Sequence, residues 1–141
     1  MATIKGTLGA DTLPGTSGAD EILGFKGNDL LLGGKGADTL YGGQGFDTLY
    51  GGQGDDVLFG DRGNDVLSGD LGADRYVFGP DSGRDFVLGF NQAEGDRLDL
   101  QGQSYTVVQQ QFGNAELRLS GGGVVELSGI RPDQVNASFF T

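Results

Sequence analysis

The chain has 141 residues, the size of one typical domain. Its 29 glycines and 3 prolines exclude collagen, and 20 acidic against 9 basic residues give a net charge of −11. Such an acidic surface repels nucleic acids and anionic membranes, so we expect neither as a partner. Histidine and cysteine are absent, which excludes disulfides, Ser/His and Cys/His catalytic pairs, and the usual zinc and haem ligands.

The start of the chain and its apolar runs bear on targeting. Residues 1–12 lack the basic end and the long apolar run of a cleaved secretory signal. No apolar stretch approaches the roughly 18 residues of a membrane-spanning helix. We therefore expect no membrane insertion.

Residues 6–77 form eight consecutive units of nine residues, such as GGKGADTLY, GGQGFDTLY and GGQGDDVLF. Positions 1 and 4 of every unit are glycine, position 6 is aspartate and position 8 is large and apolar. The glycine-rich part predicts a tight turn, and the last three residues predict a short strand with an inward-pointing central side chain. Because one unit cannot bury that side chain alone, we expect two units to make one coil of 18 residues and the coils to stack, about four in all.

The position-6 aspartates are candidate metal ligands. They are Asp11, Asp20, Asp29, Asp38, Asp47, Asp56, Asp65 and Asp74. Stacking places aspartates 18 residues apart in one column, where their like charges oppose folding unless a cation lies between them. Aspartate is also an ordinary turn residue, but eight at one period favour ligation. Carboxylate and carbonyl oxygens suit Ca²⁺ better than magnesium, zinc or copper.

The three units quoted above match the GGxGxDxUx nonapeptide, and the chain therefore resembles the RTX (repeats-in-toxin) family. The other five units depart at position 2, with Thr7, Thr16, Phe25, Asp61 and Asp70. The resemblance implies an all-β fold, a right-handed parallel β-roll followed by a small antiparallel β cap. It also implies about six calcium ions between turns i and i+2. The sites that use the first two turns would be the weakest.

The resemblance further implies backbone ligands. One turn would supply the carbonyls of positions 1 and 3, its partner those of positions 2 and 4, and both their aspartates. The glycines implied in this role are Gly24, Gly27, Gly33, Gly34, Gly36, Gly42, Gly43, Gly45, Gly51, Gly52, Gly54, Gly60, Gly63, Gly69 and Gly72.

Residues 1–78 are thus predicted to form the roll, and residues 79–141 a β-rich cap that closes its open edge. The segment FGPDSGRDFVLGF predicts a ninth, degenerate turn displaced by one residue. In this turn Asp85 would face Asp65. A plain surface aspartate is the alternative.

The rest of the cap is predicted to be an antiparallel meander. Strands are expected at 95–100, 105–112, 115–120 and 124–130. Gly113-Asn114 is typical of a two-residue hairpin turn, and three consecutive glycines at 121–123 separate the last two strands.

Residues 85–100 resemble the segment that follows the repeats in serralysin-like RTX proteins. In this family an uncleaved C-terminal signal directs export by type I secretion, which implies a secreted, extracellular protein that contacts the secretion machinery. Here Phe139-Phe140 precede the last residue, Thr141, without an adjacent acidic residue. A buried strand that packs both phenylalanines on the cap is an equal alternative.

The sequence therefore predicts a calcium-binding module that folds when calcium binds, and not an enzyme. The HExxH protease motif is impossible without histidine. A second hypothesis is an adhesion or protein-binding module that uses an exposed ladder of position-9 side chains, Leu23, Tyr41, Phe59 and Val77, although the cap or cross-strand packing could equally cover it. An ice-binding roll is disfavoured because position 3 lacks a regular array of threonine or asparagine. The chain is either a complete protein or the end of a larger RTX protein.

Overall fold

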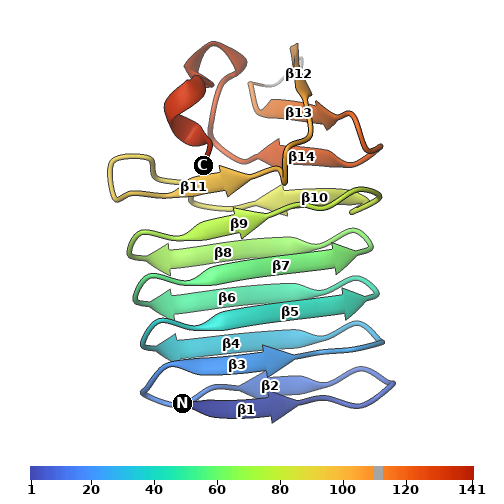
Figure 1. Ribbon diagram of the computed structural model, residues 1–141, viewed down its shortest axis with the longest axis vertical. Helices are drawn as coiled ribbons and strands as arrows, with labels where there is room; N and C mark the ends of the chain where they lie inside the picture. Colours follow the sequence, from blue (N-terminus) through green and yellow to red (C-terminus); the bar gives the residue numbers. More distant parts are fainter. Residues whose placement is uncertain (110–112) are drawn as a thin grey trace.

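The computed structural model describes residues 1–109 and 113–141, and it is almost entirely β (Figure 1). A parallel solenoid of about five coils is followed by an antiparallel region near the C-terminus. This confirms the predicted all-β class and the order of roll and cap. Within these two ranges, no helix is long and apolar enough to cross a membrane.

The coils build two facing sheets. The first contains β1 (Ala2–Lys5), β3 (Asp20–Leu23), β5 (Thr39–Gln44), β7 (Val57–Arg62), β9 (Arg75–Val77) and β11 (Arg97–Asp99). The second contains β2 (Thr12–Pro14), β4 (Leu30–Lys35), β6 (Thr48–Gln53), β8 (Val66–Leu71), β10 (Arg84–Val87), β14 (Val124–Leu127), β13 (Ala115–Leu119) and β12 (Tyr105–Gln109).

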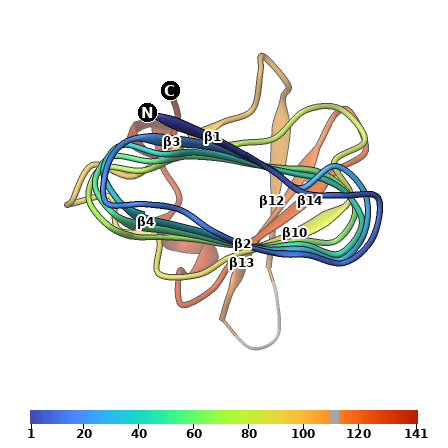
Figure 2. The same cartoon turned by 90° about the horizontal axis from the view of Figure 1, so that it is seen from below.

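Within the eight repeats, partner residues on neighbouring strands are 18 positions apart, as Leu40 and Leu58 are on β5 and β7. The coils therefore superpose when they are seen along the stack (Figure 2). The position-8 side chains line the interior, and all eight are buried: Leu13, Ile22, Leu31, Leu40, Leu49, Leu58, Leu67 and Tyr76. One inward side chain per unit leaves a thin core, as the repeat predicts.

The roll continues beyond the eight repeats. Val66 on β8 pairs with Phe86 on β10, 20 positions later, and Arg75 on β9 pairs with Arg97 on β11, 22 positions later. The ninth turn is thus displaced by two residues rather than the predicted one. The strand expected at 95–100 belongs to the parallel roll, and its assignment to the antiparallel meander is wrong. Parallel pairing crosses residue 78, and the division into two domains there stays a prediction.

Strands β12, β13 and β14 form the predicted antiparallel meander, with β14 also pairing in parallel with β10. The meander therefore extends the second sheet and covers the edge of β10, the last strand of the roll in that sheet. The glycines at 121–123 lie between β13 and β14, as expected. The predicted two-residue turn at Gly113-Asn114 is wrong, because Gln109 pairs with Ala115. Residues 110–112 of the predicted strand 105–112 lie outside the described residues.

The C-terminal residues cover the edge of the first sheet, after the short 3-10 helices η1 (Pro132–Gln134) and η2 (Ala137–Phe139). The Thr141 backbone N–H donates to the Leu98 carbonyl at 3.0 Å. The buried Phe139 ring lies 4.9 Å from that of Phe90, and the Phe140 ring stacks on Tyr105 at 4.4 Å. Phe139 therefore packs against the roll and Phe140 against the meander. A helical turn and a single β-bridge between Phe140 and Leu98 replace the expected strand.

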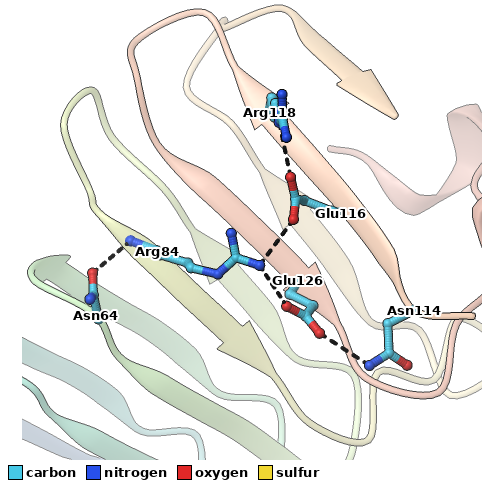
Figure 3. Close-up of polar contacts among 6 residues, drawn as sticks. All are labelled: Asn64, Arg84, Asn114, Glu116, Arg118 and Glu126. Carbon is cyan, nitrogen blue, oxygen red and sulfur yellow. Dashed lines mark hydrogen bonds and ion pairs between the residues drawn. The ribbon is translucent and has the colours of Figure 1, made fainter. Parts of the chain in front are cut away.

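A charged network joins the roll to the meander (Figure 3). Arg84 on β10 contacts Glu116 at 2.9 Å and Glu126 at 3.0 Å, on β13 and β14. Glu116 is buried and also accepts from Arg118 Nε at 2.9 Å. The Arg84 backbone N–H donates to Asn64 Oδ1 in the seventh turn at 3.0 Å. One residue thus links the meander to the repeats.

Arg84→Met is expected to destabilise the fold, because it removes a charged donor from the buried Glu116 carboxylate. The free energy of unfolding should fall by about 1.5–3 kcal/mol, measured by thermal or urea unfolding in saturating calcium. Arg131→Met is the matched control, since the Arg131–Asp133 pair is exposed on both sides. Its effect should stay below about 1 kcal/mol. Equal losses in the two variants would contradict the structural role of Arg84.

Candidate metal sites

The turns between strands carry the aspartates in two columns, one at each side of the roll. The first column contains Asp11, Asp29, Asp47, Asp65 and Asp85, and the second contains Asp20, Asp38, Asp56, Asp74 and Asp96. All except the partly buried Asp11 are buried. The eight predicted aspartates are therefore brought together as the repeat implies.

In each column, one carboxylate oxygen links successive turns. Oδ1 of an aspartate accepts a hydrogen bond from the backbone N–H of the aspartate in the preceding turn. For Asp56 Oδ1 and the Asp38 nitrogen the distance is 2.7 Å, and for Asp85 Oδ1 and the Asp65 nitrogen it is 3.0 Å. These bonds orient the carboxylates from the third turn onward, and they confirm that Asp85 faces Asp65 rather than solvent.

The second oxygen, Oδ2, differs from Oδ1 in its hydrogen bonding. In seven of the aspartates it is buried without a hydrogen-bond partner: Asp29, Asp38, Asp47, Asp56, Asp65, Asp74 and Asp85. A buried carboxylate oxygen without a donor is strongly unfavourable, which indicates that a cation satisfies it. Among residues 1–109 and 113–141, no three acidic side chains converge on one point, so most ligands would be backbone carbonyls. This oxygen-only donor set fits calcium.

The glycines bring carbonyls close to these oxygens. A Cβ on Gly42 would lie 2.6 Å from Asp47 Oδ2 and 2.8 Å from the Gly60 carbonyl oxygen of the next turn in the column. Gly33 and Gly51 have the same surroundings in the other column. A side chain at position 1 would therefore fill the space between a carboxylate and a carbonyl. The assignment of individual glycines as ligands remains a prediction.

Burial disfavours ionisation of these carboxylates. Without a cation, desolvation, with a smaller contribution from neighbouring aspartates, raises the pKa of Asp47 and of Asp56 to about 6, and that of Asp74 to about 7. Burial likewise raises the pKa of Asp65 and of Asp85, which face each other. Ionising both columns without a cation is therefore costly, and a positive charge between the turns would favour the ionised carboxylates.

The first two turns are built differently. Asp11 Oδ2 accepts from the Thr7 backbone N–H at 2.6 Å and from its hydroxyl at 2.9 Å. Asp20 Oδ2 accepts from the same two groups of Thr16, at 2.6 and 2.8 Å. The backbone N–H of Thr16 lowers the pKa of Asp20. In neither aspartate is Oδ2 left without a donor.

Asp96 is a turn aspartate that the sequence did not reveal. Its Oδ1 accepts from the Asp74 backbone N–H at 2.9 Å, and its Oδ2 accepts from that of Asn91 at 2.8 Å. Asp96 therefore occupies position 6 of a tenth turn. The Gly95-Asp96 dipeptide before a short strand with one central apolar residue was the available signal, but the wider spacing of 22 residues hid it.

The position-9 ladder is also present. Leu23, Tyr41, Phe59 and Val77 are in register on the first sheet. The Tyr41 and Phe59 rings stack at 4.6 Å. Tyr41 also lines a groove of about 430 Å³ together with Phe25, Asp61 and Arg62. This part of the ladder remains partly accessible, whereas Val77 is buried.

A family profile and one solved structure agree with this geometry. A profile of four copies of the RTX calcium-binding nonapeptide repeat matches residues 5–40 and 41–76. The R3 subunit of the Azotobacter vinelandii mannuronan C5-epimerase AlgE6 has a similar structure, with 26% identity, a TM-score of 0.55, and coverage of 96% of this chain and 80% of that chain. The extracellular lipase LipA from Serratia marcescens aligns with 17% identity and a TM-score of 0.49, over 99% of this chain and 40% of the lipase. No curated protein matched the sequence. The repeat profile covers half of the chain, and the chain belongs to the RTX family of calcium-binding nonapeptide repeat proteins.

Proposed function

We propose that this chain is a calcium-binding module whose roll folds as calcium binds. The observation that carries the proposal is the set of seven buried Oδ2 atoms without donors, arranged in two columns. A protein with so many unsatisfied carboxylate oxygens in its interior requires cations to complete its structure.

The proposed coupling follows from the chain's own residues. Without a cation, facing carboxylates such as those of Asp47 and Asp65 repel one another, and desolvation opposes their ionisation. The thin core cannot offset both this repulsion and the ordering of many glycines. Bound calcium would supply positive charge shared by oxygens of two turns. The free energy of binding then becomes free energy of folding.

Far-UV circular dichroism titrated with calcium tests the proposal. The β spectrum should appear as calcium is added, with a midpoint of about 10⁻⁴–10⁻³ M, and disappear in EDTA, whereas magnesium should not induce it. Asp56→Asn should raise the midpoint, while Asp133→Asn, at an exposed position far from the columns, should leave it unchanged. A β spectrum that persists in EDTA at pH 8 would reject the coupling.

We also propose that the protein is exported as an extended chain by type I secretion and folds outside the cell. Membership of the RTX family and the coupling above support this, because low cytosolic calcium would keep the chain unfolded. Expression with a type I export system should place the full chain in the medium, and removal of residues 132–141 should retain it in the cells. Equal export of both forms would exclude a signal in this segment.

The accessible Tyr41–Phe59 stack favours a second candidate function. In it, calcium only stabilises the roll, and the face that carries this stack binds another protein. The double variant Tyr41→Ala/Phe59→Ala should then abolish the capture of a partner protein in a pull-down, without changing the calcium midpoint of the β spectrum. Unchanged capture would count against this face. The chain itself is expected to have no catalytic role.

A further inference from the structure

We infer that the first two turns bind no calcium, because a threonine takes the place of the cation, and that the calcium-binding part of the roll instead extends to Asp85, beyond the eight repeats. This inference rests on the proposed calcium binding and specifies which turns carry it.

The threonine arrangement is complete in itself. Thr16 donates both its backbone N–H and its hydroxyl to Asp20 Oδ2, and Thr7 does the same to Asp11. Each hydroxyl oxygen also accepts from the backbone N–H of the position-4 glycine, at 3.1 Å for Gly9 and 3.2 Å for Gly18. We call this arrangement the threonine lock. It satisfies the oxygen that is left without a partner in the seven later turns.

The backbone confirms that these turns differ in kind. Phe25, Asp61 and Asp70 stand at position 2 in place of glycine, yet they keep the positive φ of glycine, 76°, 67° and 69°. The threonines of turns one and two are not among the residues with positive φ, and neither are the position-4 glycines of those turns. Departure from glycine at position 2 therefore does not by itself change the turn. Threonine changes it, because its hydroxyl reaches the aspartate.

The ninth turn, in contrast, reproduces the turns of the repeats. Asp85 is fully buried, and its Oδ2 is unsatisfied like those of the later repeats. Gly83 has a φ of 97°, and a Cβ there would lie 1.8 Å from the Gly63 carbonyl oxygen. Gly63 has the same relation to Gly45, at 1.7 Å. The position-4 geometry therefore continues one turn past the last full repeat of this column.

The second column ends earlier, because the Asn91 backbone N–H satisfies Asp96 Oδ2. One ion is expected between each two neighbouring aspartates of a column whose Oδ2 atoms are both unsatisfied. There are three such pairs in the first column and two in the second, hence five ions. The pairs are Asp29–Asp47, Asp47–Asp65, Asp65–Asp85, Asp38–Asp56 and Asp56–Asp74. The eight repeats alone would predict about six.

Counting bound calcium tests the lock, by native mass spectrometry and by isothermal titration of the full chain. The unmodified protein should bind five ions. Thr7→Gly/Thr16→Gly, which restores the glycine of the matching units, should add the pairs Asp11–Asp29 and Asp20–Asp38 and bind seven. Ser17→Gly, at an exposed neighbouring position, should still bind five. An unchanged count in the double glycine variant would overturn the lock.

Asp85→Asn tests the other end and should reduce the count from five to four, while Asp133→Asn, at an exposed position, should leave five. Circular dichroism in saturating calcium establishes that each variant is folded. If Asp85→Asn does not fold, the double glycine variant still decides the lock. A folded Asp85→Asn protein with an unchanged count would overturn the ninth-turn site. Absence of calcium binding by the unmodified chain would instead reject the proposed function.

Discussion

Gly54→Ala is expected to destabilise the fold strongly even in calcium, whereas Gly9→Ala, at the same position of the first turn, should be almost neutral. Gly54 has a φ of 136°, and a Cβ there would lie 1.9 Å from the Gly36 carbonyl oxygen. Alanine would therefore suffer both backbone strain and a clash with backbone that cannot move aside without separating two coils. Gly9 has neither problem, since the nearest atom to its Cβ is 3.9 Å away.

Strain at such a backbone position is worth about 1–3 kcal/mol, and overpacking adds a similar amount. Gly54→Ala should thus lower the free energy of unfolding by about 2–6 kcal/mol and move the calcium midpoint of the β spectrum strongly upward. Gly9→Ala should stay within about 0.5 kcal/mol of the unmodified protein. The comparison is made by thermal unfolding at fixed calcium. Similar stabilities of the two variants would show that close stacking of the turns does not exclude a side chain at position 4.

The sequence predicts the roll well because every constraint in it is periodic. A spacing of 18 residues between partners, an inward side chain at position 8 and two columns of aspartates all follow from the nine-residue unit. The prediction fails where the period changes. Insertions that widen the spacing to 20 at Phe86 and to 22 at Arg97 hid the tenth turn, because a shifted aspartate looks like an ordinary loop residue.

Details of individual turns also lay beyond the pattern. Position 2 departs from glycine in five units, and the sequence gives no reason to separate Thr16 from Phe25. The distinction depends on whether a side chain can reach its own aspartate across the turn. Threonine carries a hydroxyl on Cβ and reaches Asp20 Oδ2, whereas phenylalanine cannot donate a hydrogen bond. The hydroxyl can be read from the sequence, but its contact with the aspartate becomes visible only in the folded turn.

Protons are expected to substitute for calcium in part. Between the ordinary aspartate pKa of 3.8 and the raised values, about 6 for Asp47 and Asp56 and about 7 for Asp74, the folded chain binds more protons than the unfolded chain. The stability of the calcium-free fold should therefore be fully present below about pH 4 and be lost as the pH rises through 6 to 7. In EDTA, the β spectrum should strengthen as the pH falls from 8 to 5.

Calcium binding requires the same carboxylates to be ionised. Acid should therefore stabilise the calcium-free fold and weaken calcium binding. As the pH falls from 8 to 5, the calcium midpoint of the β spectrum should rise, because each ion displaces protons from buried aspartates. Asp74→Asn removes one titrating buried carboxyl. It should therefore weaken the pH dependence of the calcium-free β spectrum and of the calcium midpoint, whereas the exposed Asp133→Asn should leave both intact. If both variants changed the pH dependence equally, the acid effect would come from the overall charge of −11 rather than from the columns. A calcium midpoint independent of pH would mean that the buried aspartates are already ionised before calcium binds.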